Sequence, residues 1–106
     1  MPRFYVMGTY AADGMKGIVG GSDRAAAVEA IVEAVGGSLH NFSFTRGEHD
    51  IIVDVEAPSA VAMMGVMAAV RASGSFENLS YLECIDMVPI VSEAQTIAAK
   101  YKPANS

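Results

Sequence analysis

Four stretches of the chain are rich in β-branched and aromatic residues and predict the strands of one sheet. They cover residues 3–10, 38–46, 50–56 and 78–87. Two alanine- and valine-rich stretches, 24–35 and 59–72, follow a helical pattern, and a last helix begins at Pro89 and ends near Tyr101. The order β-α-β-β-α-β plus a C-terminal helix predicts an α+β, ferredoxin-like sandwich: a four-stranded antiparallel sheet with two helices on one face.

Glycine and short polar residues mark the ends of these elements. Residues 11–21 contain four glycines, which predict at best a short, irregular helical turn. Ser22 or Asp23 is a suitable N-cap for the next helix, and Gly36-Gly37 ends it. Residues 46–50 form the turn of a hairpin. The whole chain, 1–106, is interpreted as a single domain in which residues 102–106 are a frayed tail.

Because both helices cover the same face of the sheet, strand alternation assigns each strand residue to the helix side or to an open side. We expect the more apolar half of each strand on the helix side, where His40 joins Phe42 and Phe44. The predicted core is Phe4, Val6, Phe42, Phe44, Ile51, Val53, Val55, Leu82 and Cys84. The predicted open face is Tyr5, Met7, Thr9, Asn41, Ser43, Ile52, Asp54, Leu79, Tyr81, Glu83 and Ile85.

This open face is neither purely polar nor purely apolar, which indicates that something covers it. It suits the wall of a cavity closed by the sheets of two subunits. A flat dimer contact with paired polar groups fits the pattern equally well. Two observations also favour an oligomer: charged residues are only 18% of the chain, and the helix predicted over residues 59–72 is apolar around nearly its whole circumference.

Composition narrows the classes of partner. The net charge is −5, and no cluster of Lys and Arg is present, so binding to nucleic acid or to an anionic membrane is disfavoured. The apolar run 57–70 is too short to span a membrane. The single cysteine, Cys84, is expected to be a buried, inert thiol. The beginning of the chain lacks the apolar segment of a signal peptide, which predicts a cytoplasmic protein.

Several segments resemble the GYD domain family: Phe4–Tyr10, Gly36–His40, Thr45–Val53 and Val55–Pro58. The named motif would fall on Gly47, His49 and Asp50, where His49 replaces the tyrosine usual in the family. This resemblance, which extends from about Arg3 to Ala99, implies a small bacterial protein of the dimeric α/β-barrel type and a homo-oligomer. Related barrel families include haem-degrading monooxygenases, haem-dependent peroxidases and small isomerases, whose chemistry would transfer by analogy of fold alone.

The candidate catalytic residues are Asp54, Glu83 and His49. Two carboxylates in a closed cavity can act as an acid/base pair if burial raises one pKa, or they can bind water or pair with Arg3 or Arg71. His49 can be a general base or a metal ligand, or part of a solvated hairpin tip in which Asp50 binds backbone amides of the turn. No zinc spacing is present, and neither a metal nor a cofactor is predicted.

The candidate ligand-binding residues lie on the open face: Tyr5, Met7, Thr9, Asn41, Ser43 and Tyr81. They predict a homo-oligomer that binds a small, partly apolar molecule between subunits. Two alternatives remain open at this point. One is a small monooxygenase or isomerase that uses a carboxylate or His as acid/base, and the other is an assembly module with a filled interface.

Overall fold

The computed structural model of the protein describes residues 1–104. Its elements are β1 (Arg3–Tyr10), α1 (Ala12–Val19), α2 (Arg24–Ala34), β2 (Ser38–Phe44), β3 (Ile51–Glu56), α3 (Ala60–Ala72), β4 (Phe76–Glu83) and α4 (Met87–Ala98). The predicted β-α-β-β-α-β order with a C-terminal helix is present, with one additional helix, α1, between β1 and α2. The last two residues of the predicted frayed tail, 105–106, lie outside the described residues.

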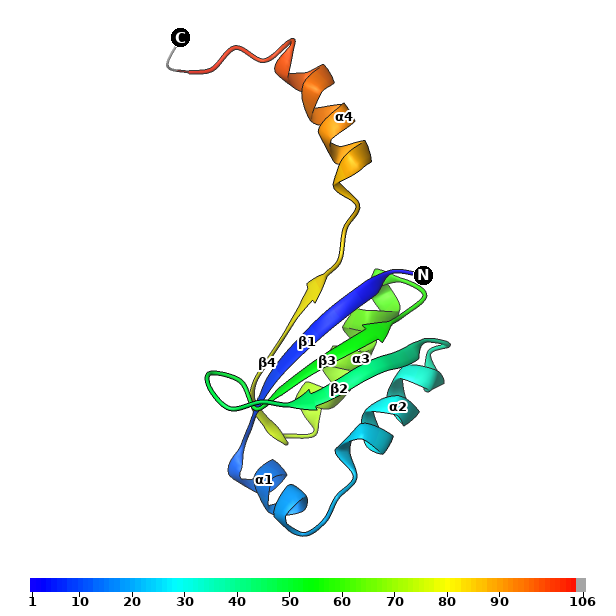
Figure 1. Cartoon of the computed structure of the whole chain (residues 1–106), viewed down its shortest axis with the longest axis vertical. Helices are drawn as coiled ribbons and strands as arrows, with labels where there is room; N and C mark the ends of the chain where they lie inside the picture. The colour runs from blue at the N-terminus through cyan, green and yellow to red at the C-terminus, as the bar shows by residue number, and fades with distance from the viewer. Residues whose placement is uncertain (105–106) are drawn as a thin grey trace.

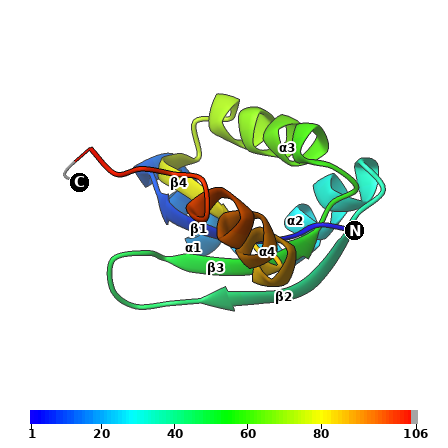
Figure 2. The same ribbon diagram turned by 90° about the horizontal axis from the view of Figure 1, so that it is seen from above.

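The strands of the described chain form one antiparallel sheet in the order β2-β3-β1-β4. The helices α2 and α3 run side by side behind one face of this sheet, with α2 over β2 and α3 over β4 (Figure 1). Seen along the perpendicular direction, the two helices form a separate layer and the other face of the sheet has no helix packed flat against it (Figure 2). The α+β sandwich with two helices on one face is thus confirmed.

The helix ends follow from the local sequence. The carboxylate of Asp23 accepts a hydrogen bond from Ala26 N at 3.0 Å, which caps α2. Gly36 ends the same helix with a φ of +83°, a conformation that costs glycine little. The helix α3 begins one residue after Ser59, whose hydroxyl accepts a hydrogen bond from Ala62 N at 3.1 Å.

The core lies between the sheet and the two helices. The predicted residues Phe4, Val6, Ile51, Val53 and Val55 are all buried there. The helices contribute Val32, Met63, Val66 and Met67, and the remaining buried apolar residues are Tyr10, Ala57 and Leu79. Each of these side chains removes apolar surface from water, which is the main favourable term in folding.

The predicted sides of β4 are wrong. Residues paired across neighbouring strands project from the same face, and β4 pairs Tyr81 with Val6 and Leu79 with Gly8, both on the helix side. Leu79 is buried, and Leu82, which was predicted to lie in the core, is exposed on the open side. Both halves of this strand are apolar enough to fill a core, so alternation alone cannot choose between them.

The predicted sides of β2 are wrong at its beginning. The strand β2 has a bulge between Leu39, which pairs with Val55, and Asn41, which pairs with Asp54. His40 is the extra residue of this bulge. Leu39 therefore packs against the core, and His40 leaves the side of Phe42 and turns toward Glu56. At the far end of the strand Phe44, predicted as core, is 59% exposed, and its ring packs edge-on against that of Phe42 at 5.0 Å.

The glycine-rich segment after β1 is a regular helix of eight residues, α1, rather than the expected irregular turn. The close approach of α1 to the segment before β4 requires glycine at position 14, because a Cβ there would collide with the backbone oxygen of Ser75. The fourth strand ends at Glu83, earlier than predicted, and Cys84 lies exposed in the following linker. The expectation of a buried thiol is therefore wrong.

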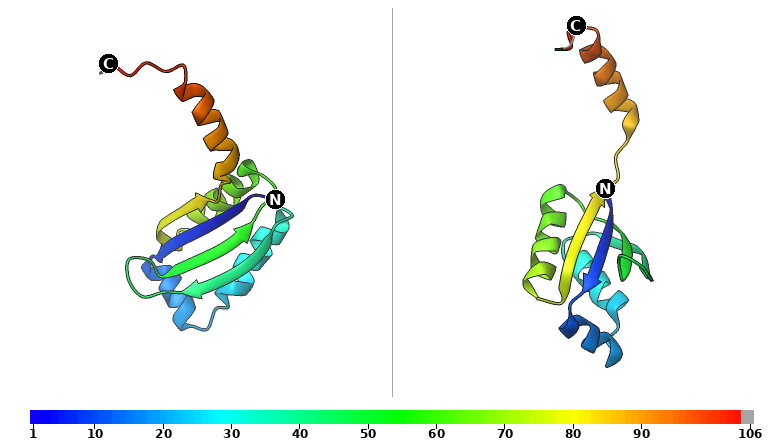
Figure 3. Two further views of the ribbon diagram at one scale, coloured as in Figure 1. Left: turned by 45° about the horizontal axis from the view of Figure 1, so that its top comes forward. Right: turned by 90° about the vertical axis from the view of Figure 1, so that its left-hand side faces the viewer.

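The last helix, α4, projects beyond the end of the sheet and makes the molecule long (Figure 3). Its principal extents are 60 × 32 × 22 Å, with a radius of gyration of 18.0 Å. A compact domain of this length has a radius of gyration of about 13 Å. Every side chain of α4 is exposed. None of the helices within residues 1–104 has the length and apolar character needed to cross a membrane.

Candidate functional site

The open face of the sheet combines apolar and polar side chains in cross-strand rows. Tyr5 lies between Asp54 on β3 and Leu82 on β4, and in the next row Met7 lies between Ile52 and Ser80. Tyr5, Ile52 and Leu82 are exposed, and Met7 is half-buried. The rows form a concentration of apolar surface that no helix of the described chain covers, which is unusual for a protein that functions as a monomer.

An ion pair lies at one end of this face. The Nε and Nη2 atoms of Arg3 donate to the two carboxylate oxygens of Asp54 at 2.8 and 2.7 Å, so the pair is bidentate. The Asp54 side chain is 14% exposed, and the hydrogen bond from Arg3 holds the pKa of this carboxyl below its ordinary value. His40 Nε2 and Glu56 Oε1, 3.1 Å apart, extend the polar region along the same edge.

The two carboxylates proposed as an acid/base pair are not brought together. Glu83 is paired with Phe4, so it projects from the helix side of β4, whereas Asp54 projects from the open side. Asp54 is also paired with Arg3, one of the partners that the sequence suggested, and its pKa is lowered rather than raised. An acid/base pair of Asp54 and Glu83 within one chain is therefore wrong, because the strand phase of β4 was inverted.

The predicted ligand-binding residues divide in the same way. Tyr5, Met7, Asn41 and Ser43 share the open face, and Asn41 Nδ2 donates to Ser43 Oγ at 3.0 Å. Tyr81 is on the opposite side, where its ring packs edge-on against Phe4 with centroids 6.0 Å apart. Three residues that were not predicted as ligand contacts lie on the open face: Arg3, Ser80 and Leu82.

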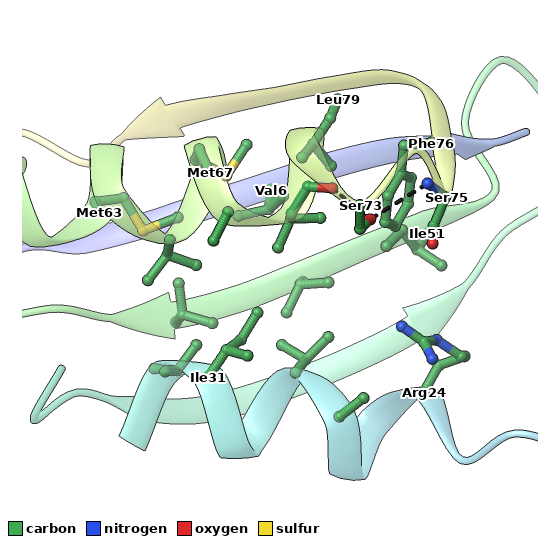
Figure 4. Close-up of a pocket in the computed structure, with 18 of the residues that line it drawn as sticks. Val6, Arg24, Ile31, Ile51, Met63, Met67, Ser73, Ser75, Phe76 and Leu79 are labelled. Carbon is green, nitrogen blue, oxygen red and sulfur yellow. Dashed lines mark hydrogen bonds between the residues drawn. The ribbon is translucent and has the colours of Figure 1, made fainter. Parts of the chain in front are cut away.

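A concave site lies on the other side of the sheet, between α2 and α3 (Figure 4). It is an open groove with a volume of about 260 Å³, lined almost wholly by apolar side chains. Ile31 of α2 faces Met63 and Met67 of α3 across this groove, with Val6 and Ile51 of the sheet as its floor. The sequence predicted the helices but not the gap between them, because their separation depends on how they sit over β2 and β4.

One end of the groove carries its polar groups. Arg24 of α2 lies there near Ser73 and Ser75, which follow α3 (Figure 4). The guanidinium of Arg24 donates to the Ser22 hydroxyl at 3.1 Å. Tyr10 also lines the groove, and burial raises the pKa of its phenol, although the neighbouring Arg24 opposes that shift.

Comparison with known proteins decides the family. The GYD domain family matches residues 4–90, most of the chain. The protein belongs to the GYD domain family. No curated protein matches this chain.

Two solved structures show the same fold as this GYD domain. One is the crystal structure of FFRP-DM1, with 19% sequence identity and a TM-score of 0.54, covering 80% of this chain and 100% of that chain. The other is the hypothetical protein PHS023 from Pyrococcus horikoshii, with 17% identity and a TM-score of 0.53, covering 81% of this chain and 92% of that chain. At these identities the likeness concerns the fold alone.

The hairpin of this GYD domain is held to the sheet rather than free in solvent. The Asp50 carboxylate accepts a hydrogen bond from Tyr10 N at 2.9 Å, and Asp50 N donates to the Gly8 oxygen at 2.8 Å. The Thr9 hydroxyl donates to the Glu48 oxygen at 3.1 Å. Asp50 does bind a backbone amide, but the amide belongs to the end of β1 and not to the turn.

Both Thr9 and His49 are thus parts of the hairpin junction. Thr9 was predicted as a ligand contact, yet its hydroxyl is engaged by the loop. The half-buried His49 is fixed through its backbone oxygen, which accepts from the Thr45 hydroxyl at 2.6 Å. Across residues 1–104 no three His, Cys, Asp or Glu side chains are grouped as a metal site would require.

Proposed function

We propose that this GYD domain works as a homodimer whose two open sheet faces enclose a small, partly apolar molecule. The observation that carries the proposal is the group of exposed apolar side chains, Tyr5, Leu82 and Ile52 from the neighbouring row, beside the Arg3–Asp54 pair. Apolar walls with a few well-placed polar groups are the usual composition of a small-molecule site.

The proposed chemistry of the ligand follows from the two ends of the face. Met7, Ile52 and Leu82 offer an apolar wall for a hydrocarbon or aromatic portion. Asn41 and Ser43 keep further hydrogen-bonding capacity, because an amide and a hydroxyl each offer more than the one bond they share. The ligand class is therefore a molecule with one apolar portion and one neutral hydrogen-bonding group.

Binding rather than acid/base catalysis is the activity that the proposal assigns to this face. The lowered pKa keeps Asp54 ionised at neutral pH, and Arg3 occupies both of its oxygens. A carboxylate in this state positions Arg3 and shapes the wall of the cavity. It is a poor general acid, because an effective one has a pKa near the working pH.

Native mass spectrometry of protein purified from its own host tests the proposal. We expect a dimer that carries additional mass from a retained small molecule, which organic extraction then identifies. Asn41→Leu is expected to lose the retained molecule and to keep the dimer, whereas Glu29→Leu, an exposed position on α2, keeps both. A dimer of unliganded mass that also fails to bind small apolar probes would contradict the proposal and favour the assembly module.

A further inference from the structure

The C-terminal helix α4 has one apolar side, and within residues 1–104 every residue of this helix is exposed. At 100° per residue, Met87, Ile90, Val91, Ala94 and Ile97 fall on one side of the helix. All of them are exposed. An isolated helix of this length is only marginally stable in water, so an amphipathic one normally depends on a partner surface.

The same chain carries a surface of the matching kind. The groove between α2 and α3 is about 260 Å³ in volume and is lined almost entirely by apolar side chains (Figure 4). The helices that flank it contain 11 and 13 residues and α4 contains 12, so groove and helix have similar lengths of roughly 18 Å. The open face of the sheet fits α4 less well, because charged and amide groups occupy one end of it.

The helix reaches the groove of another chain more readily than its own. Only residues 84–86 link β4 to α4, and three residues span at most about 10 Å. The helix α3, about 10 Å across, lies over β4, and the groove lies on the side of α3 that faces α2. The helix α3 therefore stands between that linker and the groove.

The exposed area of the chain is large enough for an interface with a second chain. The chain exposes 6969 Å², whereas a compact monomer of 11.1 kDa exposes roughly 5,700 Å². The excess, about 1,300 Å², is larger than the roughly 800 Å² that each partner buries in a standard interface. A partner that is a second copy satisfies both surfaces, since each chain then gives a helix and offers a groove.

We propose that α4 of one chain packs into the groove between α2 and α3 of a second copy. The contact uses the helix side of the sheet and is separate from the ligand cavity proposed on the open side. The two proposals can therefore fail independently.

Hydrogen exchange of α4 amides tests the contact, with variants matched on each surface. Ile97→Gln alters the apolar side of α4, and Val88→Gln alters a position about 180° from Ile97 on the same helix. Both changes raise the intrinsic helix propensity slightly, so they differ mainly in position. On the groove side, Ile31→Gln is matched by Ala30→Gln on the outer side of α2. We expect α4 amides to exchange at least about tenfold more slowly in the wild type and both controls than in Ile97→Gln and Ile31→Gln.

A mixed sample distinguishes packing of α4 against a second chain from packing of α4 against its own chain. When the Ile97→Gln and Ile31→Gln proteins are refolded together, the intact α4 of the second can enter the intact groove of the first. We expect slow exchange to return in the α4 peptide of the Ile31→Gln chain, which differs in mass from that of its partner. Fast exchange in the wild type at all concentrations, or no recovery in the mixture, would overturn the proposal.

Discussion

Truncating Leu82 tests whether the open face is the contact between subunits. Leu82→Ala removes three carbon atoms, whose burial is worth about 2.4 kcal/mol at about 0.8 kcal/mol each. Because 60% of Leu82 is exposed in the single chain, about 1.4 kcal/mol of this remains to be gained on dimerisation. A two-fold dimer contains two copies of the residue, so the dissociation constant should rise about 100-fold.

Sedimentation equilibrium over a dilution series measures this change directly. Val19→Ala is the control, because Val19 is equally apolar and even more exposed but lies at the end of α1. We expect the control to change the dissociation constant by less than about threefold, as surface substitutions usually do. A Leu82→Ala protein that dimerises as tightly as the control would refute the assignment of the interface to the open face.

Three further predictions concern the single chain. Gly37→Ala should destabilise the fold by about 1–3 kcal/mol in urea titrations, because its Cβ would collide with a β3 carbonyl oxygen, whereas Gly17→Ala, which meets nothing within 4 Å, should stabilise α1 by about 0.5–1 kcal/mol. Asp50→Ala should lower the free energy of unfolding by about 1.5–3 kcal/mol, because the buried amide of Tyr10 loses a charged acceptor. An Asp50→Ala protein with a wild-type urea midpoint would show that the hairpin does not need this bond. Asp54 has a lowered pKa, so its stabilisation should be fully present above pH of about 4 and should disappear as pH falls through the folded pKa. Acid titration should therefore show the stability gap between wild type and Asp54→Asn closing at low pH, and a gap that is constant with pH would contradict the ion pair's role.

The regular parts of the fold could be predicted because one face of each element is clearly more apolar than the other. In β1 and β3 the alternation is strict, and Phe4, Val6, Val53 and Val55 are buried as expected. The capping residue Asp23 and the glycine stop at Gly36 were also visible in the sequence.

The candidate site was harder because it depended on strand phase. In β4 apolar residues occur on both faces, with Leu79 and Tyr81 on one and Leu82 on the other. Which face of β4 turns toward the helices is decided by contacts with residues that are distant in sequence. Gly8 leaves space for Leu79, and Phe76 stacks on Tyr10 at 4.5 Å. Those contacts put Glu83 on the helix side, which removed the proposed partner of Asp54.

The bulge at His40 and the position of α4 were equally hidden. A bulge shifts the phase of a strand by one residue without breaking its alternation, so Leu39 and His40 exchange sides with no signal in the pattern. The sequence of α4 predicts an amphipathic helix, but which surface receives it is a property of the assembly.

Contacts between subunits on the open face would show directly that two sheets face each other in a dimer. An isotope-filtered NOE experiment on a sample that mixes labelled and unlabelled chains detects only contacts between different chains. The proposed dimer predicts intermolecular NOEs that involve the methyl groups of Met7, Ile52 or Leu82 and the ring of Tyr5. A dimer whose intermolecular NOEs come only from the helix side of the sheet, with none from these four side chains, would contradict it.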